Sequence, residues 1–329
     1  MNDDGESYSV TGIGTCEETD LVIPSAYNNL PVTAIKESAF IGCRSLTSIV
    51  VPDSVTSIGK GAFSGCSSLE SITLPFVGSS SGVPTMFLNG LFGYIFGHSS
   101  YVGGTETKQY YGVDHDMDAT NYIPTSLTIV TITGGILDYG AFYNCGNLVN
   151  INLSASVTTV GEHVFKNCTS LQNIEVDENN PNYMSIDGNL YTKDEKTLIL
   201  YASGKQDTFF VVPNTVTTIG NYAFFDCDSL TGVTIANSLT SIGDYAFSGC
   251  SSLTSMTIPN SVTSIGSHAF NECASLAKVV IPSSVKYVGK YAFRLCNALT
   301  IYCEASPQSG WDSKWNPANC PIVRGYTET

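Results

Sequence analysis

Cysteine is the residue type with the clearest chemical potential in this chain, because its spacing is regular. Eight of the 11 cysteines recur at one position of a repeat with a period of 23 residues. A metal site needs ligands in close pairs such as C-x-x-C, which this spacing does not supply. Two interpretations stay open: a column of buried thiols, favoured by the usual burial of free cysteine, and disulfides between successive repeats, disfavoured by parallel side-chain directions. The eight are Cys43, Cys66, Cys145, Cys168, Cys227, Cys250, Cys273 and Cys296.

The remaining three cysteines, Cys16, Cys303 and Cys320, lie outside this register. A disulfide between Cys303 and Cys320 is one hypothesis and two separate thiols are the other, since pairing cannot be deduced from sequence. Neither hypothesis supplies a metal site.

The four histidines, His98, His115, His163 and His268, fall in no catalytic motif, and we interpret them as partly exposed surface residues. The chain lacks G-x-S-x-G, which presents a nucleophilic serine at a sharp turn. It also lacks a glycine-rich loop ending in G-K-[ST], which binds phosphate. Acid–base and nucleophilic catalysis need titratable groups placed side by side. The sequence therefore predicts no enzyme and no cofactor.

The one tight acidic cluster is Asp114-His-Asp-Met-Asp118. Alternating carboxylates suit Ca²⁺, but a calcium loop also needs a glycine after the third acid and a closing glutamate. This chain has Ala119 and Thr125 at those places. We interpret the cluster as a solvated loop tip, with Ca²⁺ binding as the alternative, and assign no metal ligand.

The elements that position these residues follow from one pattern, L-x-x-I-x-I-P-x-S-V-x-x-I-G-x-x-A-F-x-x-C, present four times in residues 212–300. L-x-x-I-x-I alternates like a strand with one buried face. A-F-x-x-C has the spacing of one helical turn with an apolar face, and the glycine permits a bend with positive φ. One repeat cannot bury its own apolar residues, so stacked repeats must cover one another. The predicted core contains the eight cysteines and the repeated phenylalanines Phe40, Phe63, Phe142, Phe165, Phe224, Phe247, Phe270 and Phe293.

The segments S-V-T-S-I-G, A-F-x-x-C and S-L-T-S-I resemble the BspA-like class of bacterial leucine-rich repeats, and the similarity covers nearly the whole chain. Leucine-rich repeats have periods of roughly 20–29 residues. The resemblance implies an α/β, strand-rich leucine-rich-repeat solenoid, with a parallel inner sheet and with short helical turns and loops on the outer side. It also implies a secreted or surface-attached bacterial protein, of a class often discussed as adhesins, with no shared catalytic residues.

The net charge of −15, with only 14 Lys and Arg, argues against nucleic acid and anionic membranes as partners, since both attract clustered cations. The chain has no run of 18 apolar residues, so no membrane insertion is predicted. Its acidic start, Met1-Asn-Asp-Asp-Gly-Glu, does not have the pattern of a signal peptide. Either the chain is a piece of a longer protein or the protein stays inside the cell; the resemblance favours the first and an extracellular or cell-surface location.

Length alone suggests two domains, but a repeat array grows without splitting, so we predict a single solenoid over 1–329. The period breaks twice: Cys145 follows Cys66 by 79 residues, and Cys227 follows Cys168 by 59. Each break exceeds whole periods by enough residues to hold an insertion. The predicted parts are an N-terminal cap at 1–30, an aromatic-rich insertion at 76–123, a β-meander insertion at 177–206 and a C-terminal cap at 301–329.

Two surfaces are candidates for binding. The outward positions of the inner strands are small and mostly neutral, and they form either a solvated face suited to strands or a binding face. The insertion is either a functional surface loop or a segment whose aromatics pack it onto the solenoid. The candidate residues are Asn150, Asn152, Asn173 and Glu175 on the strand face and Tyr94, Phe96, Tyr101, Tyr110 and Tyr111 in the insertion.

These observations predict a non-catalytic extracellular recognition or adhesion module that binds a protein or glycan through the solenoid surface. The alternative is a structural spacer in a larger bacterial surface protein. A complete gene with an anchor and a separate ligand-binding domain would favour the spacer.

Overall fold

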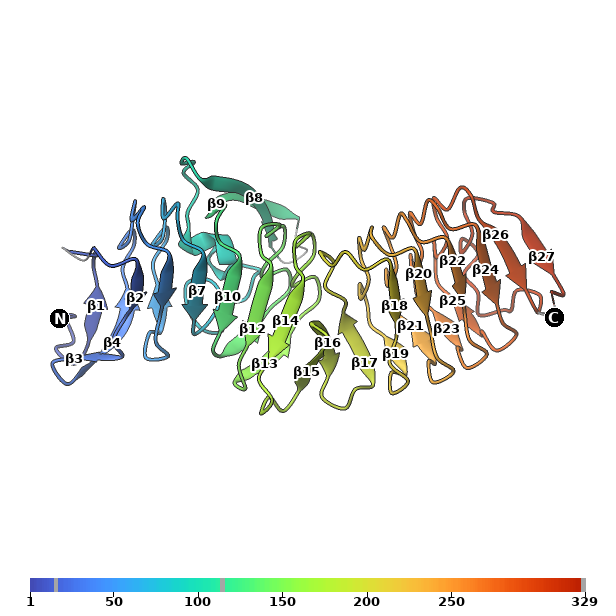
Figure 1. Ribbon diagram of the computed structural model, residues 1–329, viewed down its shortest axis with the longest axis horizontal. Coiled ribbons are helices and arrows are strands. Elements are labelled where there is room, and N and C mark those ends of the chain that lie inside the picture. The colour runs from blue at the N-terminus through green and yellow to red at the C-terminus, as the bar shows by residue number, and fades with distance from the viewer. Residues whose placement is uncertain (15–16, 113–115, 327–329) are drawn as a thin grey trace. The chain divides into compact units, whose positions relative to one another are not determined.

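The computed structural model of the protein describes residues 1–14, 17–112 and 116–326. It divides into two compact units, Met1–Asn182 and Tyr183–Thr329. Each unit is a strand-rich parallel β-solenoid, in which successive turns of the chain add strands to the same sheets (Figure 1).

The first unit contains a six-stranded parallel sheet made by the L-x-x-I-x-I segments. Ile49, Ile72, Val130, Ile151 and Ile174 pair in register across it. All five are buried, so the alternation of the pattern buries one face and exposes the other. Its strands are β2 (Asp20–Val22), β5 (Ser48–Val50), β7 (Ser71–Leu74), β10 (Ile129–Ile132), β12 (Asn150–Leu153) and β14 (Asn173–Val176).

The V-x-x-I segments of the first unit form further short strands. Two parallel groups result, β1-β4-β6 and β11-β13, and β3 pairs antiparallel with β4. The predicted insertion supplies an antiparallel hairpin, β8-β9. The bounds are β1 (Tyr8–Val10), β3 (Ala26–Tyr27), β4 (Leu30–Ile35), β6 (Ser57–Ile58), β8 (Gly104–Tyr111), β9 (Met117–Pro124), β11 (Gly135–Leu137) and β13 (Val157–Val160).

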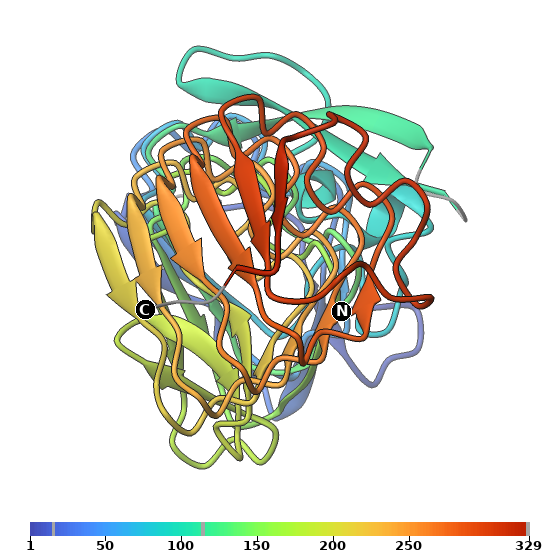
Figure 2. The same cartoon turned by 90° about the vertical axis from the view of Figure 1, so that its right-hand side faces the viewer.

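The second unit has two sheets, whose parallel strands stack one behind another (Figure 2). The first sheet is entirely parallel. The second begins with an antiparallel meander, β15-β16-β17, and continues as parallel strands. The first sheet contains β18 (Phe209–Val211), β20 (Gly232–Thr234), β22 (Ser255–Thr257), β24 (Lys278–Ile281), β26 (Thr300–Cys303) and β27 (Ile322–Arg324). The second contains β15 (Tyr183–Ile186), β16 (Asn189–Thr192), β17 (Thr197–Leu200), β19 (Thr218–Ile219), β21 (Ser241–Ile242), β23 (Ser264–Ile265) and β25 (Tyr287–Val288).

The A-F-x-x-C segments are not the helical turns that the sequence suggested. Tyr222 and Asp226, on either side of Ala223-Phe224, have φ of 60° and 55°. Their N–H groups donate to carbonyls of the next turn of the solenoid, at 2.9 Å in both cases. An α-helix needs right-handed φ throughout and internal hydrogen bonds, so this segment is a run of tight turns.

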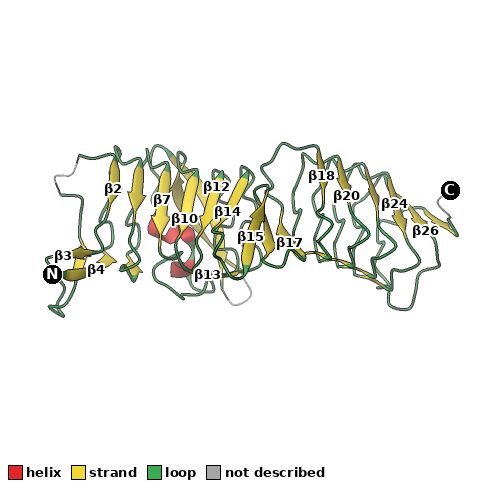
Figure 3. Cartoon of the chain, turned by 60° about the horizontal axis from the view of Figure 1, so that its bottom comes forward, coloured by secondary structure: helices red, strands yellow, loops and turns green. Residues whose placement is uncertain are grey.

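The same pair of positive-φ positions recurs in other repeats, for example at His268 and Glu272. Helix in the described ranges is confined to the 3₁₀ segments η1 (Leu88–Gly90) and η2 (Phe92–Ile95) (Figure 3). The fold is therefore a strand-rich parallel β-solenoid, and the expected α/β class is not supported.

The glycine of V-x-x-I-G also differs from expectation, because its role is close packing. Gly266 has no positive φ, but a Cβ there would lie 2.5 Å from the backbone nitrogen of Asp244 in the preceding turn. Its N–H donates to the carbonyl of Ile242 at 2.9 Å. Glycine is needed here because two backbones touch.

Phenylalanine rings form a stacked column through the core. In the second unit the ring centroids of Phe224, Phe247, Phe270 and Phe293 follow one another at 4.7, 5.3 and 5.3 Å. Trp315 packs edge-on against Phe293 at 5.9 Å, so the C-terminal residues cover the last ring. In the first unit, the matching stacked pairs are Phe40 with Phe63 and Phe142 with Phe165.

The cysteines lie beside this column. Cys250, Cys273 and Cys296 each donate a thiol hydrogen bond to the phenylalanine carbonyl of the preceding turn, over 2.9–3.1 Å. Cys66 and Cys168 do the same in the first unit, over 3.2 Å. These five thiols therefore share one arrangement, in which each is directed at a backbone carbonyl.

No disulfide joins any of the ten described cysteines, so the bridges between repeats and the Cys303–Cys320 bridge are both absent from that set. Cys320 instead donates to the carbonyl of Cys296 at 3.3 Å. Burial raises the pKa of the Cys66 and Cys168 thiols to about 12. Cys43 is partly exposed and is the exception among the described cysteines, and Cys16 lies outside them.

We expect nine of the described thiols to react with a thiol reagent only when the protein unfolds, because they are buried and the thiolate is the reactive form. The measurement is labelling at pH 8 of a Cys16→Ser variant, followed by mass spectrometry. One fast site, at Cys43, is the expected result. Fast labelling of Cys250 or Cys273 in the folded protein would show that the column is open to solvent.

Within each unit, aromatic residues from a segment that breaks the sequence period join the phenylalanine column. Phe92 and Phe96 of the insertion contact each other at 5.2 Å, and they join Phe63 (6.3 Å from Phe96) to Phe142 (4.7 Å from Phe92). In the second unit, Tyr201 stacks on Phe224 at 5.3 Å and donates its N–H to the carbonyl of Ala223. Residues of other sequence therefore take the phenylalanine position at both breaks.

Candidate binding site on the strand face of the second unit

The outward side chains of the first sheet of the second unit form two rows on the face opposite the core, and Val280 is the buried member of them. Val233, Met256 and Val279 point inward and are buried. The outward rows are in register across the strands, and β18 contributes two exposed large apolar residues, Phe209 at 56% and Val211 at 58%. The rows hold Phe209, Gly232, Ser255, Lys278 and Thr300, and Val211, Thr234, Thr257, Val280, Tyr302 and Val323.

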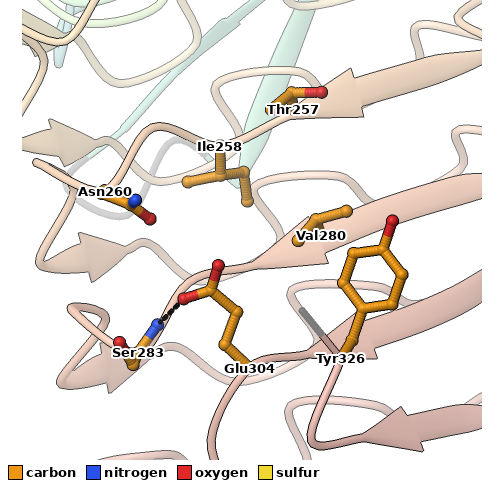
Figure 4. A pocket seen from close by; sticks show the side chains of 7 residues that line it. All are labelled: Thr257, Ile258, Asn260, Val280, Ser283, Glu304 and Tyr326. Atoms are coloured by element: carbon orange, nitrogen blue, oxygen red, sulfur yellow. Dashed lines mark hydrogen bonds between the residues drawn. The ribbon is translucent and has the colours of Figure 1, made fainter. Parts of the chain in front are cut away.

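Two hollows lie where these strands end and the chain turns away. The first, about 420 Å³, lies between Phe209, Asn237 and Pro259. The second, about 400 Å³, is shown in Figure 4. Thr257 lines both hollows, so they are neighbours on one face. The second is lined by Thr257, Ile258, Asn260, Val280, Ser283, Glu304 and Tyr326.

Tyr326 forms an aromatic wall of the second hollow, and three contacts hold it in place. Lys278 Nζ donates to its hydroxyl at 3.2 Å. Its ring packs edge-on against Tyr302, with centroids 4.9 Å apart. Its N–H donates to the carbonyl of Cys303 at 3.2 Å. Lys278 Nζ also lies 5.2 and 5.0 Å from the two ring centroids, a cation–π arrangement. The ring is therefore positioned before any ligand arrives.

Glu304 is the one carboxylate that lines this hollow. Its Oε2 accepts the N–H of Ser283 at 3.0 Å, so the side chain reaches from the segment after β26 to the turn after β24 (Figure 4). The described residues offer no partner to Oε1, and none to the side-chain amide of Asn260. The hollow thus presents a carboxylate oxygen and an amide beside an aromatic ring.

The strand-face residues of the first unit that the sequence singled out bond to their neighbours. Asn152 Nδ2 donates to Thr131 Oγ1 at 3.0 Å, and Asn173 Nδ2 donates to Glu175 Oε1 at 2.9 Å. Asn150 lies between Ile129 and Asn173 in register. All lie on the outward face as the alternation predicts, and a binding role for them stays a prediction.

The aromatic residues of the insertion mostly attach it to the solenoid. Phe96 is fully buried in the phenylalanine column, and its burial removes it from the candidate binding residues. Tyr101 donates its hydroxyl to the carbonyl of Tyr122 at 3.0 Å, and burial raises its pKa. Tyr110 packs edge-on against Tyr143 at 5.0 Å.

Tyr94 and Tyr111 are half-buried. A buried glutamine adds to the attachment: Gln109 accepts the N–H of Gly93 at 2.7 Å and donates to the carbonyl of Ala141 at 3.1 Å. The packing alternative therefore describes most of this insertion.

The described histidines are engaged in structure. His268 stacks on Tyr245 at 4.4 Å and packs edge-on against Tyr291 at 5.2 Å. Burial, together with Arg294 and Lys290, lowers its pKa. His163 stacks on Tyr139 at 4.7 Å, and His98 Nδ1 lies 2.8 Å from the carbonyl oxygen of Thr120.

The acidic cluster is only partly visible, since Asp114 and His115 lie outside the described residues. Asp118 pairs with Lys108 at 2.9 Å, and both side chains are about half exposed. In the described part of the chain, no three His, Cys, Asp or Glu side chains gather to hold a metal ion.

The family model described as BspA type Leucine rich repeat region matches in six copies, at residues 16–82, 125–193 and 201–309. The chain belongs to this family. The longest unmatched internal stretch, 83–124, lies almost wholly within the predicted insertion.

Solved structures similar to this BspA-type chain come from bacteria. A leucine rich cell surface protein from Faecalibacterium prausnitzii A2-165 is 24% identical, with 100% of this chain and 96% of that chain covered and a TM-score of 0.44. A leucine-rich repeat protein from Eubacterium ventriosum ATCC 27560 is 21% identical, with 99% and 92% covered and a TM-score of 0.49. The pneumococcal vaccine antigen PcpA is 19% identical, with 98% and 83% covered and a TM-score of 0.46. A comparison with curated proteins found no match.

The described residues of the BspA-type chain include no helix with the length and hydrophobicity needed to cross a bilayer.

The two hollows could not be predicted from the sequence, because their walls come from segments that lie far apart in the chain, between Phe209 and Tyr326. One signal was present. The last strand segment, Leu299-Thr-Ile-Tyr-Cys, is one residue shorter than the L-x-x-I-x-I pattern. Ile301 and Cys303 therefore point inward and Tyr302 points outward.

Proposed function

We propose that this BspA-type repeat region is a non-catalytic recognition module that binds a protein or a glycan through its solenoid surface outside the cell. The observation that carries the proposal is the strand face of the second unit, where two neighbouring hollows lie beside exposed Phe209 and a fixed Tyr326. Preformed concave sites with an aromatic wall and a few polar groups are typical of ligand binding. Stacked repeats also present extended binding surfaces.

The proposed location is the cell surface. One similar structure is named as a leucine rich cell surface protein, which supports this placement. Of the total charge of −15, little falls near the hollows, whose lining holds one acid, Glu304. We expect neither nucleic acid nor membrane as a partner, because both select for clustered cations.

A non-catalytic role is supported by the state of the groups that catalysis would use. Burial raises the pKa of the Cys66 and Cys168 thiols, whereas reactive thiols have lowered pKa values. His268 packs between Tyr245 and Tyr291 and lines neither of the two hollows.

The alternative function is a structural spacer in a larger surface protein. It is favoured by the strand face of the first unit, where Asn152 bonds Thr131 and Asn173 bonds Glu175. Side chains that satisfy one another offer less to a ligand. The spacer and the recognition module differ in one respect, which is whether the second unit binds anything.

The test is a binding screen of the whole chain against matrix proteins, mucins and glycans. Binding to at least one class is expected. Thr257→Lys, which places a long cationic side chain in both hollows, should weaken that binding at least about tenfold, the effect of about 1.4 kcal/mol. The matched control is Thr240→Lys, at an exposed threonine outside the hollows. If the chain binds no matrix protein, mucin or glycan, the proposal is contradicted.

A further inference from the structure

The chemistry that lines the second hollow is more specific than a general binding surface. Val280 and Ile258 lie beneath the hollow and are nearly inaccessible, so Tyr326 supplies the aromatic wall that a ligand would meet. The polar lining consists of hydroxyls, one amide and one carboxylate, with no cationic side chain among them. An anionic ligand would face Glu304, and the ammonium of Lys278 beside the hollow already bonds the Tyr326 hydroxyl and lies against the Tyr302 and Tyr326 rings.

We propose that this hollow binds one sugar ring of a neutral glycan, with Tyr326 packed on the ring's apolar face and with Glu304 and Asn260 bonded to its hydroxyls. The inference rests on the proposed function as a recognition module and names its ligand class and its contact residues.

The aromatic contact follows from the shape of a sugar ring, one face of which is a patch of C–H groups. Such a patch packs on an aromatic ring, and burying it removes apolar surface from water. Tyr326 suits this role because Lys278 and Tyr302 already hold its ring. A fixed ring loses little conformational freedom when the ligand binds, which strengthens binding.

The polar contacts follow from the hydrogen-bonding capacity that remains. A carboxylate has about four lone-pair sites, and the N–H of Ser283 occupies one of those on Glu304. The amide of Asn260 both donates and accepts. A sugar hydroxyl also both donates and accepts, so neighbouring hydroxyls can satisfy both side chains at once.

A peptide strand is a poorer fit to the same place. Peptides that bind sheets in extended form add to an exposed edge strand. The second hollow lies over β22 and β24, which are paired on both sides. Their main-chain groups are therefore engaged, and recognition must come from side chains.

The first hollow indicates how a longer glycan would extend from the second hollow. It shares Thr257 with the second and ends at Phe209, whose ring lies over Gly232. A Cβ on Gly232 would lie 2.9 Å from Phe209 Cδ2, so glycine leaves room for the ring. A chain of several sugars lying across the strands reaches both aromatic residues. Oligosaccharides should therefore bind more tightly than the matching monosaccharide.

The experiment uses the whole chain and an array of neutral oligosaccharides built from glucose, galactose, mannose and N-acetylglucosamine. Sialylated and sulfated oligosaccharides, and immobilised fibronectin and collagen, form the comparison arms. The affinity of the tightest neutral binder is then measured by calorimetry for four variants. Tyr326→Ala should lower it at least about tenfold, and Glu304→Gln and Asn260→Ala about fivefold each, because aromatic anchors and charged hydrogen bonds dominate binding sites.

The matched control is Tyr287→Ala, which removes an exposed tyrosine from β25 in the other sheet and should change the affinity less than twofold. Circular dichroism and the thermal midpoint check that each variant is folded. Asn260 is exposed, and its side chain has no hydrogen bond within the described residues. Asn260→Ala therefore tests the site even if Tyr326→Ala is unstable.

Neutral glycan binding that weakens in the three site variants supports the inference. Binding confined to the matrix proteins or to the anionic glycans overturns the inference and leaves the proposed recognition function standing. If Asn260→Ala and Glu304→Gln leave neutral glycan binding unchanged, the site lies elsewhere. That result also overturns the inference and leaves the proposed recognition function standing. No binding in any arm overturns both.

Discussion

Replacing Phe247 by alanine is expected to lower the free energy of unfolding by about 3–5 kcal/mol, the range for a large aromatic residue removed from a packed core. Phe247 is fully buried. Its ring lies 4.7 Å from Phe224 and 5.3 Å from Phe270, within 7° and 1° of parallel. Its carbonyl accepts the thiol of Cys273 at 3.1 Å. The truncation therefore opens a cavity between two turns whose backbones are already bonded to each other.

The measurement is chemical denaturation followed by circular dichroism. The matched control is Phe209→Ala, the same change at a phenylalanine that is 56% exposed in the same unit, and it should cost less than about 1 kcal/mol. Equal effects of the two substitutions would mean that the phenylalanine column does not carry the stability of this unit.

The second large effect is expected at Gly59, where a Cβ would meet the backbone of the preceding turn. The nearest atoms would be the nitrogen of Glu37, its Cα at 2.6 Å and the carbonyl carbon of Lys36 at 2.7 Å. The two turns cannot move apart freely, because the N–H of Gly59 donates to the carbonyl of Ile35 at 2.8 Å. Gly59→Ala should cost about 3 kcal/mol, at the upper end of ordinary overpacking, because the clash is with backbone.

The control for Gly59→Ala is Gly134→Ala in the same unit. A Cβ on Gly134 would have only ordinary contacts, the nearest at 3.6 Å from the carbonyl oxygen of Pro75, and neither glycine has positive φ. Gly134→Ala should be neutral or slightly stabilising, since it restricts the unfolded chain. If both variants unfold at the same denaturant concentration, close approach of the turns is not what requires glycine at position 59.

The two units differ in what their strand faces offer to a ligand. In the first unit, polar side chains such as Asn152 and Asn173 bond along the face. In the second, Phe209 and Val211 are exposed, and Glu304 and Asn260 keep hydrogen-bonding capacity beside Tyr326. The same repeat thus builds a face with internally bonded polar side chains and exposed Val22 and Val50 in the first unit, and a candidate site beside Tyr326 in the second. The difference lies in the outward positions, which the core leaves unconstrained.

Several features could be predicted from the sequence, because they depend on local polarity and spacing. The alternation in L-x-x-I-x-I predicted strands with one buried face, and Ile49, Ile72 and Val130 lie in register on that face. The fixed position of phenylalanine in each repeat predicted a column of buried rings, and Phe224, Phe247 and Phe270 stack in it. A repeat that cannot bury its apolar residues alone must stack on its copies, so these features follow from composition and period.

Other features were decided only by the tertiary structure. The turn at Tyr222–Asp226 has helical spacing, but the N–H groups of Tyr222 and Asp226 bond to the next turn of the solenoid, and both residues have left-handed φ. Phe92, Phe96 and Tyr201 complete the column from segments that break the period. The second hollow joins Asn260, Glu304 and Tyr326 from three turns. Sequence patterns report how each residue meets water or its near neighbours along the chain, whereas these contacts depend on which turn lies against which.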